Sequence, residues 1–425
     1  MRRRPLLALA SAIVLPSAAA CSLFATEDPS GCAPAQGTPT SLRSIELGVK
    51  ASLDLGFAPS LPAAGDFDGD GHIDIAVADP SGGVVTVWSG SGDWNFAMSR
   101  TVAAEGNARV VASADLDQDG LADLIIGGSG SPNGEALSDH LRVIYGNADF
   151  TSAAVVPYDT DPASGNNSPL GTTSVAVGDM NADGLLDVIT GTEEGGGFVF
   201  FNEGSQSFGL GQRYEGSGHA AHTILEDLDG DGEPSLITYG RADKLSDDPA
   251  VEGQVVTDAF IRAYSMNNGV LTEEPGDTPG TLAQTQAPMG APMVTVVDFN
   301  GDNRPEPVGA FNAALHVYGN VGGRISSDTA HLICMDNGGM RTEVSGLVTT
   351  ELDQDSTAEI VTLNLLTNDL VIMTVRSGIL TAPIHVDAGI PGGEQLASED
   401  VDGDGWPEIL VTDPDGNQLH IVAVE

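Results

Sequence analysis

A short acidic loop that recurs seven times is the feature that most limits how this chain can fold. Its clearest copy, residues 66–74, reads DFDGDGHID. The copies begin at Asp66, Asp115, Asp179, Asp227, Asp298, Glu351 and Asp400, and successive starts lie 48 to 71 residues apart. A repeat of this length indicates an array of similar structural units rather than a series of unrelated domains.

All seven copies share one pattern of side chains. Positions 1, 3, 5 and 9 carry oxygen donors, position 2 is apolar, and position 6 is glycine in five of the seven copies. Oxygen donors on a flexible loop suit Ca2+, which accepts six to eight ligands, including backbone carbonyls and water. A single Asp-Gly cluster would fit a solvated hairpin turn equally well, but the repetition of the donor positions favours a metal-binding loop.

The expected ligands are the side chains at positions 1, 3, 5 and 9 and the backbone carbonyl at position 7, whose side chain varies freely. Four complete copies contain Asp66, Asp68, Asp70, His72 and Asp74; Asp115, Asp117, Asp119, Leu121 and Asp123; Asp179, Asn181, Asp183, Leu185 and Asp187; and Asp400, Asp402, Asp404, Trp406 and Glu408. Three irregular copies contain Asp227, Asp229, Asp231 and Glu233; Asp298, Asn300, Asp302, Arg304 and Glu306; and Glu351, Asp353, Asp355, Thr357 and Glu359.

The irregular copies are expected to bind calcium more weakly, or in part not at all. Ser235 stands at position 9 of the fourth copy, Asn303 replaces the glycine of the fifth, and Ser356 replaces that of the sixth. The sixth copy also begins with Glu351 in place of aspartate. The chain therefore predicts up to seven calcium sites, of which four have the complete pattern.

The EF-hand is the competing interpretation of such a loop, and the residue at position 12 excludes it. An EF-hand requires a glutamate there and a helix on each side. Position 12 is instead Val77, Ile126, Thr190, Thr238, Gly309, Thr362 or Val411. A β-rich apolar run follows each loop, such as IDIAVA and ADLIIG, so each loop is expected to connect two strands.

Four strands can be assigned to each repeat from residue 41 onward. One apolar strand enters the acidic loop, a second leaves it, a third follows, and a turn precedes a fourth. Seven units of four antiparallel strands predict an all-β fold, a seven-bladed β-propeller. The seventh unit ends after its third strand, and the segment RSIELGV (43–49) is the candidate for its missing fourth, which would close the ring.

Loops such as GDFDGDGHIDIAV and ADLDQDGLADLIIG resemble those of the FG-GAP, or VCBS-type, repeat proteins, which include the seven-bladed propeller of integrin alpha subunits. The resemblance covers about residues 41–425. It implies that positions 1, 3, 5 and 9 and the position 7 carbonyl hold calcium. The departures at Ser235, Asn303, Glu351 and Ser356 weaken the resemblance at those sites.

The charge of the chain limits its partners and its compartment. Sixty-one acidic residues against sixteen basic ones give a net charge of -45. Such a chain is not expected to bind nucleic acid or an anionic membrane surface directly. Much of the negative charge belongs to the acidic loops, so the composition predicts a compartment that contains calcium.

The N-terminus predicts export. Residues 2–4 are arginines, an apolar run follows, and SAAA precedes Cys21, which together form a signal peptide over residues 1–20. The alanines before Cys21 resemble a bacterial lipobox and predict lipidation of Cys21, with ordinary cleavage after Ala20 as the alternative. Residues 21–40 have the composition of a flexible tether. Export permits a disulfide between Cys32 and Cys334, and two free thiols are the alternative.

Four common catalytic or nucleotide-binding signatures, GxSxG, HExxH, the Walker-type GK(S/T) and GxGxxG, are missing, and a non-catalytic role is expected. His219 and His222 lie in an extended strand and are interpreted as structural. Packing is the expected role of Trp88, Trp94 and Trp406, although an aromatic exposed between blades would favour sugar binding.

Long connections identify the expected binding face. Residues 128–140, 157–171, 240–258 and 273–292 all lie on the face opposite the acidic loops. Polar candidates for contacts with a partner are Asn133, Asp139, His140, Tyr158, Asp161, Asn166, Arg241, Lys244 and Asp248. The leading interpretation is a monomeric, lipid-anchored, calcium-stabilised propeller that binds a protein or glycan at the outer membrane or cell surface, or after secretion or in the periplasm. The alternatives are a lectin and a glycan lyase or hydrolase.

Overall fold

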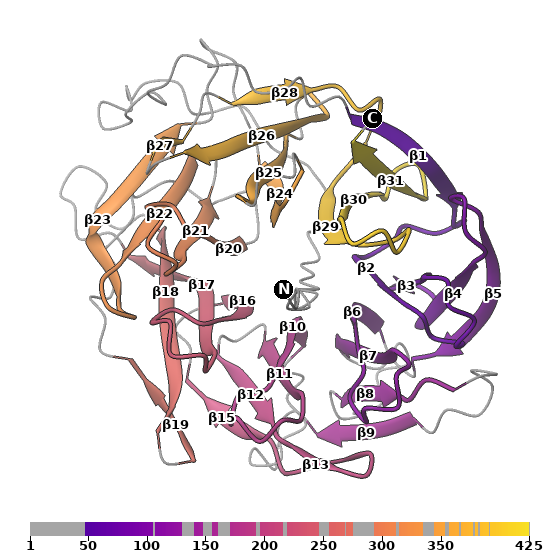
Figure 1. Ribbon diagram of the computed structural model, residues 1–425, viewed down its shortest axis with the longest axis horizontal. Coiled ribbons are helices and arrows are strands. Elements are labelled where there is room, and N and C mark those ends of the chain that lie inside the picture. Colours follow the sequence, from indigo (N-terminus) through magenta and orange to yellow (C-terminus); the bar gives the residue numbers. More distant parts are fainter. Residues whose placement is uncertain are drawn as a thin grey trace.

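The computed structural model describes most of the repeat region. The described residues are 47–104, 107–129, 140–147, 155–159, 171–192, 196–215, 219–245, 255–267, 269–274, 293–311, 314–334, 344–352, 357–364, 367–376, 379–380, 383–390 and 392–424. These segments form seven antiparallel sheets arranged around a central axis (Figure 1). The predicted all-β, seven-bladed propeller is therefore confirmed.

The sheets are numbered here as blades in the order of their acidic loops. Blade 1 contains β2 (Pro62–Gly65), β3 (Asp74–Asp79), β4 (Val84–Gly90) and β5 (Phe96–Ala103). Blade 2 contains β6 (Asn107–Ala114), β7 (Asp123–Ser129), β8 (His140–Ile144) and β9 (Val155–Asp159). Blade 3 contains β10 (Thr172–Gly178), β11 (Asp187–Thr192), β12 (Gly197–Phe200) and β15 (Gln212–Tyr214). A small hairpin of β13 (Asn202–Gly204) and β14 (Ser207–Phe208) interrupts blade 3.

The next three blades follow the same order. Blade 4 contains β16 (His219–Glu226), β17 (Ser235–Leu245), β18 (Val255–Asn267) and β19 (Val270–Glu273). Blade 5 contains β20 (Met293–Val297), β21 (Glu306–Phe311), β22 (Ala314–Asn320) and β23 (Ile325–Cys334). Blade 6 contains β24 (Val344–Thr350), β25 (Glu359–Asn364) and β26 (Asp369–Arg376), with both β27 (Ile379–Leu380) and β28 (Ile384–Val386) paired to β26.

Blade 7 joins the two ends of the repeat region. It contains β29 (Gln395–Glu399), β30 (Glu408–Asp413) and β31 (Gln418–Val424), and β1 (Leu47–Asp54) supplies its outer strand. The pairing runs from Leu47 opposite Val424 to Asp54 opposite Gln418. Closure by an N-terminal strand is thus confirmed, and residues 47–49 of the predicted segment 43–49 lie in this strand, whereas residues 43–46 lie outside the described residues. The pairing continues beyond the predicted segment to Asp54 and includes Leu53, whose burial stabilises the strand.

The first strand of each blade lies nearest the axis, and neighbouring first strands contact one another around the ring (Figure 1). Hydroxyl groups join several of these strands. Ser174 Oγ lies 2.9 Å from Thr223 Oγ1, and Ser398 Oγ donates to Thr350 Oγ1 over 2.8 Å. Such bonds satisfy polar groups where the inner strands converge.

The apolar cores lie mainly between blades rather than within one blade. One cluster joins Ala76 and Val87 of blade 1 to Val111 and Leu124 of blade 2. Position 2 of each described acidic loop enters such a core, and Phe67, Leu116 and Met180 are at most 1% exposed. The predicted role of position 2 as a core anchor is confirmed for these loops.

Because β1 completes blade 7, its removal should destabilise the whole ring. A chain that starts at residue 55 would expose the core around Leu53, and fully burying one leucine contributes about 1.5–3 kcal/mol. We expect its melting temperature to fall by several degrees in differential scanning calorimetry. A chain that starts at residue 47 serves as the control and should melt like the full-length protein. Equal melting of both truncated chains would show that β1 does not close the ring.

Candidate metal centres at the blade junctions

Every acidic loop connects the first and second strands of its blade, as predicted. In the first loop, Asp66 Oδ1 accepts a hydrogen bond from Gly69 N over 2.7 Å and Oδ2 accepts one from Gly71 N over 3.0 Å. The same bonding of position 1 to the amide of position 6 recurs at Asp115, Asp179, Asp227, Asp298 and Asp400. The loop backbone therefore folds around its first carboxylate.

Two residues in each described loop adopt a left-handed backbone. Position 6 does so, as predicted, and Gly71 has a φ of 86°. Position 4 does so as well, including Gln118 at 63° and Ala182 at 59°, and this requirement was missed in the sequence. Asn303 takes φ 62° at position 6, because asparagine tolerates this region better than most residues. The loss of glycine there leaves the path of the fifth loop unchanged.

The carboxylate at position 9, at the start of the second strand, forms hydrogen bonds both to the acidic loop and to the third strand of the blade. Asp74 Oδ2 accepts from Phe67 N over 3.2 Å, and Oδ1 accepts from Gly90 N of the third strand over 2.9 Å. Asp123 and Asp187 form the equivalent two bonds. The glutamates Glu306, Glu359 and Glu408 keep the bond to position 2. Ser235 has a single oxygen and cannot span both partners as a carboxylate does.

Burial raises the pKa of these position 9 carboxyl groups. Asp74, Asp123 and Asp187 are fully buried. Burial raises their pKa values to about 6, 7 and 6, while the backbone hydrogen bonds act in the opposite direction. Burial also raises the pKa of Glu408 to about 8. Ionisation of position 9 is therefore costly unless positive charge lies nearby.

Carboxylates gather closely in four loops. Ligand oxygens within 4.8 Å of one another come from Asp66, Asp68 and Asp70; Asp115, Asp117 and Asp123; Asp227, Asp229 and Asp231; and Asp400, Asp402 and Asp404. Such oxygen-only sets fit a hard cation and could bind metal. The assignment of individual ligands, including the position 7 carbonyls, stays a prediction.

The loops that gather three carboxylates differ at two positions in the chain from the four loops that were predicted to be complete. The fourth loop gathers three carboxylates although Ser235 marked it as irregular. In the third loop, Asn181 replaces one acid, and its Nδ2 donates to Asp183 Oδ2 over 3.0 Å. In the fifth loop, Asn300 Nδ2 likewise donates to Glu306 Oε1 over 2.6 Å. Asp353 and Asp355 of the sixth loop lie outside the described residues.

Some loops are also hydrogen-bonded to the following blade, and these bonds were not predicted from the sequence. Asp66 O accepts from Ala122 N over 3.0 Å, so the first loop is bonded to the second. Gln118 Nε2 donates to Gly184 O over 2.7 Å, and Gln206 Nε2 donates to Asp117 Oδ2 over 2.7 Å. A carboxylate of the second candidate metal site is thus bonded to blade 3.

Two asparagines bridge successive loops in the same way. Asn202 Nδ2 donates to Leu116 O of the preceding loop over 2.8 Å and to Leu186 O of its own loop over 3.1 Å. Asn320 Nδ2 donates to Leu228 O over 2.6 Å and to Pro305 O over 2.9 Å. The signal in the sequence was an asparagine at the end of the third strand, in FFN and YGN.

Glycine occupies the equivalent position in blades 1 and 2 because the backbone approaches closely. A Cβ on Gly90 would lie 2.1 Å from Ile73 O, and one on Gly146 would lie 2.5 Å from Ala122 O. Any side chain there would displace the acidic loop. The end of the third strand therefore contacts the acidic loop whether asparagine or glycine stands there.

The remaining polar and aromatic candidates have structural roles where the structure describes them. His222 is buried, and its Nδ1 accepts from Val294 N of the next blade over 3.2 Å. Burial lowers the pKa of His222 to about 4, so it is neutral, and its predicted structural role is confirmed. Trp88 Nε1 donates to Thr86 Oγ1 over 3.2 Å, and both Trp88 and Trp94 pack against the core.

The predicted long connections are partly wrong. Residues 240–245 and 255–258 are paired strand, because β17 and β18 continue as a hairpin up to Leu245 opposite Val255. His140, Tyr158, Arg241 and Lys244 therefore lie in strands rather than at loop tips. The other candidates, Asn133, Asp139, Asp161, Asn166 and Asp248, lie outside the described residues. So does most of 128–140, 157–171 and 273–292.

The residues concerned by the predictions for the N-terminus also lie outside the described part of the chain. These concern the signal peptide, Cys21, the tether and Cys32, whereas Cys334 ends β23. Within the described segments, no helix has the length and apolar character needed to cross a membrane.

Comparison with known proteins supports the repeat assignment. Residues 66–126 and 179–238 match the FG-GAP-like repeat family, so the chain contains FG-GAP-like repeats. No curated protein sequence matches the chain. Among solved structures, BBS1N in complex with ARL6DN is 12% identical with a TM-score of 0.53, covering 89% of this chain and 94% of that one. An Agrocybe aegerita lectin that recognises non-reducing terminal N-acetylglucosamine is 17% identical with a TM-score of 0.48, covering 80% of each chain.

These structural similarities concern the fold alone, and the fold fits a binding module. Repeat rings expose broad faces, and their functions depend on the residues placed there. The residues that suggest a specific chemistry are those of the candidate metal centres, where carboxylate oxygens lie close enough to share a metal ion.

The raised pKa values predict an unusual pH dependence for the metal-free protein. An acid whose pKa rises on folding stabilises the fold at low pH, and that stability is lost as the pH rises through the folded pKa. With EDTA present, the melting temperature should therefore fall between pH 5.5 and pH 8, and Asp123→Asn should reduce this fall. Ca2+ should restore stability mostly at pH 8, where the carboxylates are ionised. A metal-free protein that melts higher at pH 8 would contradict the assignment.

Proposed function

We propose that this chain is a calcium-stabilised β-propeller binding module, exported and displayed at the cell surface, without catalytic activity. The observation that supports this most strongly is the gathering of three carboxylates in each of four described loops, of which the first, second and fourth are also hydrogen-bonded to the next blade. Calcium in these loops would hold the ring together and leave the opposite face available to a partner. The metal thus has a structural role, and binding is assigned to the ring surface.

Calcium fits the donor sets better than a transition metal. The gathered groups contain carboxylate oxygens and no histidine or cysteine, and hard oxygen ligands suit calcium or magnesium. The flexible loops of nine residues offer several donors, which suits the larger coordination number of calcium. Asp68, Asp70 and the equivalent residues would coordinate the ion, and the buried position 9 carboxylate would hold the loop against the blade.

The glycan-binding and glycan-active alternatives are distinguished by a direct test. A glycan and protein array probed with the calcium-loaded protein should reveal a ligand, and a glycan ligand would favour the lectin interpretation. Release of products from a bound glycan would favour the enzyme. Binding of neither class in the presence of calcium would contradict the binding module.

Removal of calcium should destabilise the fold. A site at one hundred times its dissociation constant contributes about 2.7 kcal/mol, which is large against ordinary domain stabilities of about 5–15 kcal/mol. We expect EDTA to lower the melting temperature at pH 8 and excess Ca2+ to restore it. Mg2+ at the same concentration is the control and should restore less. A melting curve that EDTA leaves unchanged would exclude the metal role.

Within the loops, Asp70→Ala should cost more stability than Ser235→Ala in the presence of calcium. Asp70 belongs to a gathered set, whereas Ser235 offers one neutral oxygen at position 9 of another loop. The difference between the two variants should vanish in EDTA, which separates a metal effect from ordinary packing. A larger cost for Ser235→Ala would reverse the ranking of these positions.

Surface display should depend on Cys21. If lipidation anchors the protein, Cys21→Ser should move it from the membrane fraction to the soluble fraction or leave it unprocessed. Cys32→Ser is the matched control and should fractionate like the wild type. Unchanged membrane association of Cys21→Ser would exclude the lipid anchor and leave the propeller proposal intact.

A further inference from the structure

The exposed large apolar side chains of the described residues all lie toward one end of the blades. This end carries the acidic loops and the connections from third to fourth strands, and it is called the loop face here. Its six exposed side chains, called the aliphatic rim, are those of Val49, Met98, Leu210, Val270, Val321 and Val424. Single exposed apolar residues are normal on any surface, but a set that shares one end indicates an interaction site.

The two most exposed members of the aliphatic rim lie beside acidic loops. Leu210 is 87% exposed and follows the β13–β14 hairpin, whose Gln206 donates to the second acidic loop over 2.7 Å. Val321 is 61% exposed, and a Cβ on Gly323 in the same turn would lie 2.5 Å from Asp229 Cβ of the fourth loop. The aliphatic rim therefore borders the candidate metal centres.

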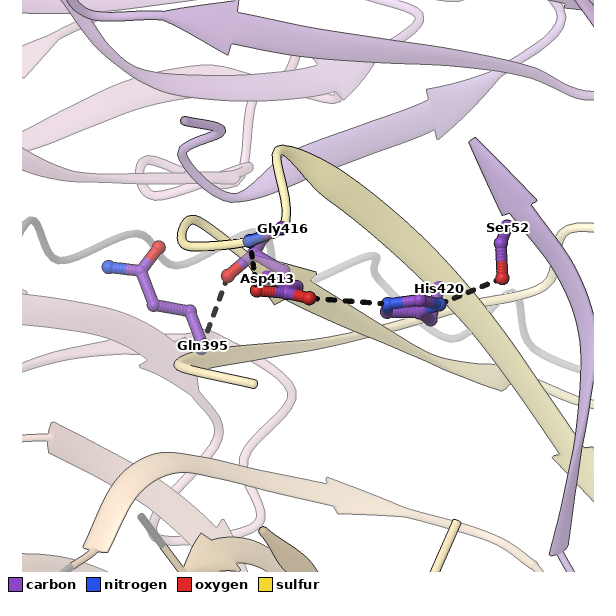
Figure 2. Close-up of polar contacts among 6 residues, drawn as sticks. Ser52, Gln395, Asp413, Gly416 and His420 are labelled. Atoms are coloured by element: carbon purple, nitrogen blue, oxygen red, sulfur yellow. Dashed lines mark hydrogen bonds and ion pairs between the residues drawn. The ribbon is translucent and has the colours of Figure 1, made fainter. Parts of the chain in front are cut away.

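Turns at the opposite end of the blades are polar. In blade 7, Asp413 Oδ1 accepts a hydrogen bond from Gly416 N over 2.7 Å in the turn between β30 and β31 (Figure 2). In blade 1, Asp79 Oδ1 accepts from Ser81 N over 2.9 Å and from Gly82 N over 2.8 Å. Neither of these two described turns exposes a large apolar side chain. The two ends of the ring thus offer different kinds of surface.

The distribution of the aliphatic rim favours a broad, flat partner. Its members lie on blades 1, 3, 4, 5 and 7, so they are spread around the axis (Figure 1). A lipid bilayer contacts all of them at once, whereas a protein that covers one side of the ring leaves the others exposed. A second copy of the chain would bring two negative faces together, and these repel each other.

The N-terminal segment joins the ring at the same face. β1 begins at Leu47, which pairs with Val424 at the end of β31. A flexible tether over residues 21–40 would span about 25 Å on average, so an anchor at Cys21 would hold the loop face close to a membrane. Such proximity gives even a weak docking surface a high local concentration of lipid.

The charge of the chain selects the kind of lipid. The gathered carboxylates lie on the loop face, and a calcium ion in each set would offset part of their charge. Four such ions leave a chain with a net charge of -45 strongly negative. Anionic lipids would therefore be repelled, whereas a zwitterionic bilayer accepts aliphatic side chains without this cost.

Two tryptophans also lie on the loop face. Trp94 belongs to the turn between β4 and β5, Trp406 belongs to the seventh acidic loop, and both are half-buried. A tryptophan that packs with one part of its ring and meets solvent with the other suits the boundary between lipid and water. These side chains therefore fit the same partner as the aliphatic rim.

We propose that the loop face docks onto a zwitterionic lipid bilayer, with the aliphatic rim inserted at the lipid–water boundary. This docking rests on the proposed function, because it takes the calcium-loaded loops and the N-terminal anchor from it. Docking in this orientation turns the opposite face of the ring away from the membrane. It thereby determines which end of the propeller is presented to a ligand.

Vesicle flotation of a chain that begins at Cys21 tests the proposal. This chain keeps every residue that the structure describes, and Cys21→Ser prevents attachment of a lipid. In saturating Ca2+ we expect it to float with phosphatidylcholine vesicles at millimolar lipid. Leu210→Ser and Val321→Ser should each weaken binding about tenfold, because each removes an aliphatic side chain from the lipid. Addition of phosphatidylglycerol should also weaken binding, since it makes the vesicles negative.

Asp415→Leu is the matched control. Asp415 is exposed in the turn between β30 and β31, so this variant adds an apolar side chain at the opposite end and leaves the loop face unchanged. It should bind vesicles like the wild type. Lipids brominated near the headgroup should quench the tryptophan fluorescence of the bound protein, and Trp406→Phe should reduce this quenching.

Several outcomes would overturn the docking. These are a wild type that does not float, Leu210→Ser and Val321→Ser variants that float as well as the wild type, and an Asp415→Leu variant that floats better. Dimerisation in Ca2+ that Leu210→Ser abolishes would instead assign the loop face to a second copy of the chain. If Ca2+ raises the melting temperature without vesicles but the chain does not float, the proposed function stands and the docking alone is rejected.

Discussion

Repulsion between neighbouring carboxylates is the interaction on which the rest of this ring depends. Four loops each place three carboxylates with ligand oxygens within 4.8 Å of one another. Two such charges about 4 Å apart repel by roughly 4 kcal/mol at an effective dielectric constant near 20. Backbone N–H groups offset part of this repulsion, since Asp66 alone accepts two of them. A bound cation would offset the remainder of this repulsion.

The loops matter beyond their own blades because several of them are hydrogen-bonded to the next blade. Asn202 and Asn320 each bond to the carbonyls of two successive loops. The apolar cores also lie between blades, as the cluster of Phe67 with Val111 illustrates. A metal ion that orders one loop therefore orders the contact with the next blade. The seam of blade 7 differs, because β1 from the N-terminal part of the chain pairs there with β31.

The sequence predicted the repeats well because their constraints are local. Donor spacing, the apolar residue at position 2 and the glycine at position 6 all act within nine residues, and they led correctly to seven blades. The extent of the closing strand was harder to predict, since only the pairing with β31 shows that it continues from residue 49 to Asp54. Gln206 and Asn202 were missed because they act on residues more than eighty positions away. Their polar character alone does not distinguish them from other surface side chains.

We propose that the gathered carboxylates bind calcium at the blade junctions. The most direct measurement is anomalous diffraction from crystals grown in calcium, which locates the ions without reference to stability. We expect an anomalous peak inside each of the four gathered sets, with carboxylate oxygens at about 2.3–2.6 Å. Loops that contain only water in saturating calcium would contradict it.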